Sequence, residues 1–180
     1  MKVVLISGSP RPEGNTMAAL KKCAAAIKKA GVEAEIISLH DKEIRGCKAT
    51  RACGKLGKCA INDGLNEIIE KVKAADGYVV GAPVYYGTAR GDIMNAIQRI
   101  AMVAGNNGKW LAGKVGGPIV VARRGGLTAT IQEMLMHFPG STYWNILFGG
   151  PEGAVLEDEE GIGTVETFGK NMAELIKKIN

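Results

Sequence analysis

The sequence has no long apolar run, and this absence excludes a membrane-spanning protein. Its longest stretches without a charged residue, 77–89 and 138–151, are interrupted by glycine and proline, and both are shorter than the ~18 apolar residues that a membrane span needs. Near the N-terminus only residues 3–6 form an apolar run, which is too short for the core of a secretory signal peptide. We therefore expect a cytoplasmic protein that does not enter a membrane.

Cysteine and histidine are also scarce, with four and two residues respectively. The cytosol keeps thiols reduced, so a disulfide framework is not expected. His40 and His137 have no second ligand at a spacing typical of metal sites, and we interpret both as structural or surface residues. The sequence assigns no metal ligand.

Basic residues are not gathered into one block, although the formal net charge is +5. Lysines occur in pairs at 21–22, 28–29 and 177–178, which we interpret as solvated faces of helices. A nucleic-acid-binding surface usually interleaves basic and aromatic residues, so no nucleic acid is expected as a partner. We interpret the acidic run 157–160 as a solvated loop.

Short β-branched apolar runs alternate with amphipathic segments along the whole chain. The predicted strands are residues 3–6, 35–39, 77–82, 115–122 and 143–148. The predicted helices are residues 15–30, 65–74, 90–103 and 127–138, and a final helix with Val165, Phe168, Met172, Leu175, Ile176 and Ile179 on one face. We find no internal repeat or linker, and 180 residues with 46% hydrophobic composition suffice for one domain, 1–180.

This alternation predicts an α/β three-layer sandwich, because right-handed crossovers lay helices on both faces of a parallel sheet. We expect five parallel strands in the order 2-1-3-4-5. Ligands of such sheets bind beyond the carboxyl ends of the strands, at the point where the strand order reverses. The loops after the first, third and fourth predicted strands meet there.

The first of these loops, SGSPRPEGNT at residues 7–16, has the composition of an anion site. Ser7, Ser9, Asn15 and Thr16 can donate hydrogen bonds to phosphate oxygens, and Arg11 can add a charge-assisted one. The start of a helix contributes free N–H groups and its dipole. The loop has neither the Walker A nor the dinucleotide glycine pattern, so a single terminal phosphate fits better. The alternative is an ordinary loop in which Asn15 or Thr16 caps the helix.

The loop SGSPRPEGNT resembles the phosphate loop of the NADPH-dependent FMN reductase family and of its iron-sulfur flavoprotein branch. The segment GAPVYYGTARGDIMNAIQR, residues 81–99, is similar to the segment with which that family wraps the flavin ring, and the likeness extends over nearly the whole chain. The resemblance implies a flavodoxin-like fold with bound flavin mononucleotide (FMN). The cofactor-binding residues that we predict are Ser7, Ser9, Pro10, Arg11, Asn15 and Thr16, then Pro83, Val84, Tyr85, Tyr86 and Gly87, then Arg123, Arg124, Gly125 and Gly126.

Two pairs of residues in the later loops have alternative interpretations. Tyr85 and Tyr86 can stack on a flavin or lie at its edge, but aromatic residues also pack loops. Arg123 and Arg124 can stabilise the negative charge of a reduced flavin or meet a nicotinamide phosphate, but they can equally be solvated surface residues.

The long segment 40–64 has no hydrophobic period and holds Cys47, Cys53 and Cys59. It resembles the cluster loop of iron-sulfur flavoproteins, in which Cys-x-x-Cys-x-x-Cys is followed by a fourth cysteine, but Thr50 stands at the second position. Because cubane clusters are generally held by four thiolates, we consider a [4Fe-4S] cluster and do not favour it. A cluster or another redox use, and a loop that descends from a cluster site and is now empty, both stay open. Cys23 lies on the apolar stripe of the first predicted helix and is interpreted as a small core residue.

The resemblance implies an enzyme that passes electrons from NAD(P)H as co-substrate, through bound FMN, to a small second acceptor such as a flavin, a quinone or a redox protein. The flavin carries this chemistry, so no catalytic side chain is assigned. We also expect a homodimer or homotetramer, since members of the family commonly complete the flavin pocket with a neighbouring subunit. Two alternatives are a non-enzymatic electron carrier, of flavodoxin or iron-sulfur flavoprotein type, and a basic module that binds nucleic acid or phospho-ligands.

Overall fold

The computed structural model describes residues 1–135, 137 and 146–179. Its strands are β1 (Lys2–Ser7), β2 (Glu33–Ser38), β3 (Gly77–Tyr85), β4 (Thr88–Ala89), β5 (Val115–Ala122) and β6 (Ile146–Phe148). Its helices are α1 (Asn15–Lys29), α2 (Cys53–Leu56), α3 (Leu65–Ala74), α4 (Gly91–Gly105), α5 (Leu127–Leu135), the 3₁₀ helix η1 (Ala154–Glu157) and α6 (Glu159–Ile179). Within these described ranges, no helix is long and apolar enough to cross a membrane.

The parallel strands follow the order β2-β1-β3-β5-β6, which confirms the predicted order 2-1-3-4-5. The short strand β4 was not predicted. It pairs antiparallel with the end of β3, where Val84 is opposite Ala89 and Tyr85 is opposite Thr88. The turn between them consists of Tyr86 and Gly87, both at positive φ (50° and 90°), as two-residue hairpins require. The predicted strand 77–82 ended three residues before the end of β3. The hairpin was missed because its turn sequence, Tyr-Gly, is not the Asn-Gly pair that usually indicates such a turn.

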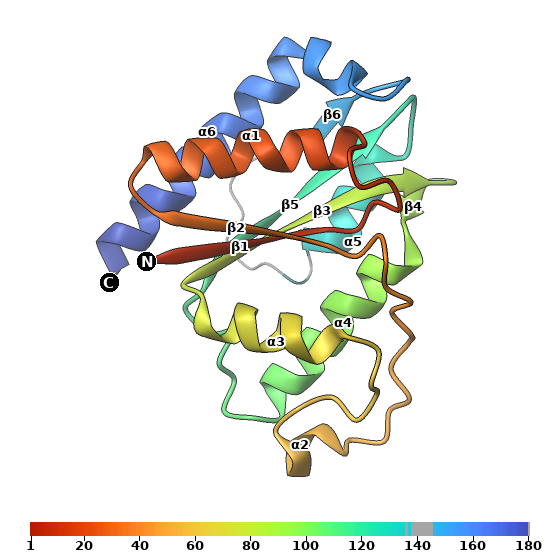
Figure 1. Ribbon diagram of the computed structural model, residues 1–180, viewed down its shortest axis with the longest axis vertical. Coiled ribbons are helices and arrows are strands. Elements are labelled where there is room, and N and C mark those ends of the chain that lie inside the picture. The colour runs from red at the N-terminus through yellow and green to blue at the C-terminus, as the bar shows by residue number, and fades with distance from the viewer. Residues whose placement is uncertain (136, 138–145, 180) are drawn as a thin grey trace.

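The sheet separates two hydrophobic cores (Figure 1). Helices α1 and α6 cover one face, and α3, α4 and α5 contribute to the core on the other face. Successive side chains of strand β1 alternate between the two cores. Val4 and Ile6 point to the α3/α4 side, while Val3 and Leu5 point to the α1/α6 side. All four side chains are fully buried, as expected of a central parallel strand.

Helix α6 buries a narrower stripe than we predicted. Val165, Met172 and Ile176 are buried as expected, whereas Leu175 and Ile179 are 45% and 52% exposed. The helix approaches α1 closely at a glycine: a Cβ on Gly169 would lie 2.8 Å from the carbonyl oxygen of Cys23. This close contact centres the buried stripe on residues 165, 169, 172, 173 and 176, so Leu175 and Ile179 lie beyond its edge.

Two short helices, α2 and η1, were not predicted, and three of the four residues of the predicted acidic loop 157–160 belong to η1 and α6. The other differences lie at the ends of elements. Strand β2 begins at Glu33, two residues before the predicted start, and α5 ends at Leu135. Residues 136, 138 and 143–145, which we predicted to belong to a helix and a strand, lie outside the described residues. Cys23 is fully buried, and this burial raises the pKa of its thiol to about 12, which supports the interpretation as a core residue.

Candidate functional site

A small cleft lies at the carboxyl ends of β1, β3 and β5, where the strand order reverses. Its volume is about 160 Å³. The residues that line it are Ser9, Arg11, Gly14, Asn15 and Thr16, then Pro83, Val84 and Tyr85, then Val121, Ala122 and Arg123, and finally Gly149 and Gly150. Three loops that the sequence singled out therefore meet in one place.

Not every predicted residue lines the cleft. Eight of them do, and the structure brings them together from three loops. The predicted residues outside its lining are Ser7, Pro10, Tyr86, Gly87, Arg124, Gly125 and Gly126. The glycines Gly149 and Gly150 were not predicted, because they follow the last strand and carry no side chain that signals a ligand.

The N-terminus of α1 is open toward the cleft. The cap residue is Gly14, in an extended conformation, and no side chain among the described residues caps the helix. The first helical hydrogen bond runs from the amide of Ala18 to the carbonyl of Gly14 (3.0 Å), so the amides of residues 15–17 precede the helical ladder. The alternative in which Asn15 or Thr16 caps the helix is therefore wrong. Free amides and the positive end of the dipole together favour an anion here.

Buried hydroxyl groups surround this helix terminus. Ser7, Ser9 and Thr16 are all buried. The hydroxyl of Ser9 accepts a hydrogen bond from the amide of Arg11 (3.1 Å). The hydroxyl of Ser7 has no hydrogen-bond partner in the described part of the chain, and an unsatisfied buried hydroxyl is costly unless a ligand or water pairs with it.

The loop of residues 7–16 is held against the sheet and α4. The amide of Gly8 donates to the carbonyl of Gly81 (2.8 Å). A Cβ on Gly8 would lie 2.5 Å from the Cβ of Ile93, so only glycine allows the loop to lie this close to the helix. The one acidic side chain of the loop, Glu13, pairs with Lys21 (2.5 Å) on α1. Its charge is thereby partly neutralised.

Asn15 connects α1 to the segment that follows β6. Its side-chain amide donates to the carbonyl of Pro151 (3.0 Å) and accepts from the amide of Val155 (3.4 Å). A Cβ on Gly149 would lie 2.8 Å from the same side-chain nitrogen. Asn15 therefore positions the fourth wall of the cleft, and its predicted hydrogen bond to phosphate stays a prediction.

The β3–β4 hairpin, residues 84–89, forms the wall beside Tyr85. Glu133 of α5 accepts hydrogen bonds from the amide of Ala89 (2.6 Å) and from the hydroxyl of Thr88 (2.7 Å). A Cβ on Gly126 would lie 2.7 Å from the Cα of Gly87, so the predicted third loop packs directly on the hairpin turn. Sequence reasoning missed Glu133, because its partners lie more than 40 residues earlier in the chain.

The residues of the cleft fit FMN. An uncapped helix terminus, the buried hydroxyls of Ser9 and Thr16 and the cation of Arg11 suit a terminal phosphate. Sites that enclose a drug-sized ligand have volumes of roughly 300–1,000 Å³, so a cleft of about 160 Å³ takes only part of the cofactor. The ring would then lie outside, against the hairpin and Tyr85.

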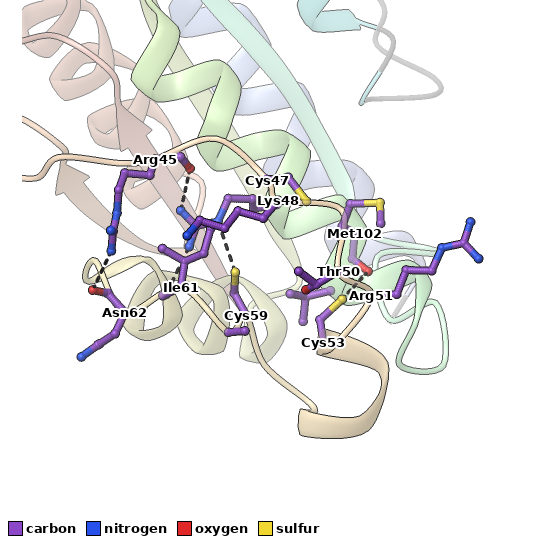
Figure 2. A pocket seen from close by; sticks show the side chains of 13 residues that line it. Arg45, Cys47, Lys48, Thr50, Arg51, Cys53, Cys59, Ile61, Asn62 and Met102 are labelled. Carbon is purple, nitrogen blue, oxygen red and sulfur yellow. Dashed lines mark hydrogen bonds between the residues drawn. The ribbon is translucent and has the colours of Figure 1, made fainter.

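A second cavity, of about 320 Å³, lies under segment 40–64 and is lined by Cys47, Cys53 and Cys59 (Figure 2). Each sulfur has its own neighbour. The Sγ of Cys47 accepts from the amide of Ala49 (3.4 Å), Cys53 contacts the carbonyl of Met102 (3.8 Å), and Cys59 accepts from Nε of Arg99 (3.2 Å). Cubane clusters are generally held by four thiolates, and Thr50 supplies a hydroxyl at one of the four positions of this segment. The donor set present therefore does not fit a four-thiolate iron-sulfur cluster.

Arg99, which sequence reasoning missed, organises this segment from α4. The side chain is almost fully buried, and its guanidinium contacts both carboxylate oxygens of Asp63 (2.6 and 3.0 Å). It also donates to the carbonyls of Arg45 (2.9 Å) and Ile61 (3.3 Å). The only sign of this role in the sequence was that Arg99, a charged residue, stands on the face of α4 that is otherwise apolar and buried.

The chain matches the family described as NADPH-dependent FMN reductase over residues 1–144. It is 38% identical to an iron-sulfur flavoprotein of Methanocaldococcus jannaschii over an alignment of 193 positions, which covers 99% of both chains. Its fold is similar to that of an NAD(P)H:quinone oxidoreductase from Methanothermobacter marburgensis (TM-score 0.71, 13% identity, 96% of each chain). It is also similar to that of a flavodoxin from the domain Archaea (TM-score 0.64, 16% identity, 98% of this chain and 99% of that one). The chain therefore belongs to the NADPH-dependent FMN reductase family and is an FMN-dependent oxidoreductase with a flavodoxin-like fold.

Proposed function

We propose that the chain passes electrons from NAD(P)H, through FMN bound at the carboxyl ends of β1, β3 and β5, to a small acceptor such as a flavin or a quinone. When bound, FMN takes up a hydride and releases electrons, chemistry that the protein itself does not supply. The open N-terminus of α1, which lines the cleft together with the buried hydroxyls of Ser9 and Thr16, is the observation that carries the assignment of the site.

The phosphate of FMN would bind to the amides of residues 15–17 and to the buried hydroxyls of Ser7, Ser9 and Thr16. Arg11 would add a charge-assisted hydrogen bond, which is about twice as strong as a neutral one. The ring would lie along the hairpin 84–89, whose backbone is held by Glu133. Arg123 lines the cleft, and its charge would stabilise the negative charge of the reduced ring.

A double substitution tests the phosphate assignment. Ser9→Ala with Arg11→Ala should weaken the binding of FMN more than that of riboflavin, which lacks the phosphate. Fluorescence titration of both ligands measures the difference, and Lys22→Ala, which removes an exposed cation from α1, serves as the control. Equal weakening of the two ligands, or no weakening, would show that the phosphate binds elsewhere.

Steady-state oxidation of NADH and NADPH by the FMN-loaded protein tests the enzymatic role. We expect rapid turnover with a flavin or quinone acceptor. A protein that binds FMN but is reduced slowly by both nucleotides would instead be a non-enzymatic electron carrier.

We further propose that the chain forms a homodimer or homotetramer in which the hairpin contacts a neighbouring subunit. Tyr86 is fully exposed at the tip of the hairpin, and Phe148, next to Gly149 in the cleft wall, is 54% exposed. Exposed aromatic side chains around a ligand site are typical of an interaction surface. A monomeric mass in light scattering at micromolar concentration would contradict this proposal.

All four cysteines of the chain are free. Free thiols, three of them accessible, suit a reducing compartment. We infer on this ground that the chain works in the cytoplasm. We also propose that residues 1–180 form one FMN-binding domain, because the parallel strands belong to one sheet.

A further inference from the structure

The net positive charge of the chain is concentrated in one segment. Residues 44–62, bounded by Glu43 and Asp63, contain five basic residues and no acidic residue. The complete chain has 23 basic and 18 acidic residues, so the 18 basic residues outside the segment are balanced by the 18 acidic ones. Among the described residues, none of these five cations takes part in an ion pair.

Three of the five cations line the cavity of about 320 Å³ that also holds the cysteines. They are Arg45, Lys48 and Arg51, and the hydroxyl-bearing Thr50 stands between the last two. Figure 2 shows Thr50 between Cys53 and Cys59, with Arg51 extending outward from the rim. Of the described residues that form the lining, none is acidic. The cavity therefore has a positive field that nothing in its wall neutralises.

The walls are held in place by side chains of the neighbouring helices. Asn66 of α3 makes two hydrogen bonds of 2.9 Å to the backbone of Cys59. Asn95 of α4 donates to the carbonyl of Ile44 (2.9 Å), and Asn107 donates to the carbonyl of Cys53 (3.1 Å). Together with Arg99, these contacts give the cavity its shape without any metal. A preformed cavity costs little ordering when a ligand binds.

The chemistry of the lining excludes the simplest occupants. A free metal cation would be repelled by the three unpaired cations, and the three thiols do not form a group that could bind one within the described residues. Thr50 replaces one thiolate of the four that usually hold a cubane cluster. What remains is a concave, positively charged site with hydroxyl and thiol donors.

We propose that this cavity binds a small molecule with two or more negative charges, carried by phosphate, sulfonate or carboxylate groups. Lys48 and Arg51 supply the charge, Thr50 supplies a hydroxyl donor, and Ile61 and Met102 cover the less polar part of the ligand. The site is separate from the FMN cleft. The β3–β4 hairpin of the FMN cleft comes just before the N-terminus of α4. Arg99, in the wall of the second cavity, lies eight residues after the first residue of α4, which is about 12 Å farther along the helix axis.

Calorimetric titration of the FMN-saturated protein with pyrophosphate at low ionic strength tests this site. FMN saturation keeps the probe out of the phosphate loop. We expect saturable binding at one site per chain, weakened about tenfold or more by Lys48→Gln with Arg51→Gln, since two charge-assisted contacts are lost. The matched control is Lys55→Gln with Lys58→Gln, which removes the same charge from the same segment at positions outside the lining.

Four contrary outcomes would overturn the proposal, each for its own physical reason. Equal weakening in both double variants would show that the probe responds to the general charge of the surface and not to the cavity. Absence of saturable binding to the wild type would show that the cavity does not take up the anion. Loss of the signal in the variant Ser9→Ala with Arg11→Ala would locate the probe in the FMN cleft. Stoichiometric iron and sulfide in protein purified without oxygen would show that a cluster fills the cavity instead.

Discussion

At the scale of single residues, the pair of Arg99 and Asp63 is a buried ion pair whose loss would be costly. Both side chains are almost fully buried, at 1% and 5% exposure. Taking two charges out of water is expensive, and removing one partner of such a pair leaves the other uncompensated at a cost of about 3–5 kcal/mol. The pair also fixes the backbone of residues 45 and 61, so its loss would loosen the wall of the second cavity.

The substitution Asp63→Asn should lower the free energy of unfolding at neutral pH, and the loss should depend on pH. Burial disfavours the carboxylate of Asp63, but the hydrogen bonds from Arg99 and from the amide of Arg45 outweigh it and lower the pKa of this carboxyl. Because the pKa is lower in the folded state, the stabilisation is complete above the unfolded value of about 3.9. It is lost as the pH falls through the folded value.

Urea denaturation of the wild type and of Asp63→Asn across the acid range measures this effect. The difference in free energy of unfolding should be constant near neutral pH and shrink below about pH 4. Asp41→Asn, at an exposed acid of the same segment, should show little difference at any pH. A difference for Asp63→Asn that does not change with pH would contradict the ion-pair account.

At the scale of elements, the β3–β4 hairpin is a wall of the proposed FMN site that depends on distant contacts. Two strands of this length are marginal on their own in water. The hairpin is held by Glu133 at one end and by the close approach of Gly126 to the turn. Helix α5 and the loop before it therefore act as a support on which the wall of the cleft rests.

Glu133→Ala should weaken FMN binding several-fold while leaving the sheet intact. The substitution leaves the partly buried amide of Ala89 without its acceptor, which costs about 1–3 kcal/mol, and the hairpin becomes free to move away from the ring. Fluorescence titration with FMN and far-ultraviolet circular dichroism measure the two effects. Gln132→Ala, at the exposed neighbouring position, should bind FMN as the wild type does, and an equal loss in both variants would count against a specific role of Glu133.

At the scale of the whole molecule, the chain aligns over 99% of its length with a relative named iron-sulfur flavoprotein. Thr50, however, stands at one of the four ligand positions of the cluster loop that segment 40–64 resembles. Three thiols and Thr50 surround a cavity that the protein shapes with its own hydrogen bonds. A threonine hydroxyl is a poor ligand for iron compared with a thiolate. Electron transfer would then involve FMN alone.

We expect iron and acid-labile sulfide near background in wild-type protein purified without oxygen. Thr50→Cys should raise both after reconstitution, because it restores the fourth thiolate at the Cys-x-x-Cys spacing. Ala52→Cys, which adds a thiol to the same segment at another spacing, should not. Iron and sulfide in the wild type at the level of one cluster per chain would refute the expectation.

The sequence by itself determined the order of the elements, because strand and helix periods are local properties. The strand Val115–Ala122 and the helix Leu65–Ala74 coincide with the predicted ranges, and the parallel order follows from the alternation of strands and helices. The loop 7–16 could be predicted as a phosphate site for the same reason, since its residues are contiguous and precede a helix. Its amide donors, however, could be counted only once Gly14 proved to be the cap.

Only the tertiary structure decided which distant residues meet. Arg99 contacts Asp63 across 36 residues of the chain, and Glu133 contacts Thr88 across 45. Such pairs leave no periodic pattern, because each partner is one polar residue in its own segment. The same holds for the three cysteines: their spacing indicates a cluster loop, but the positions of the sulfurs depend on how Arg99 and the neighbouring asparagines hold the backbone.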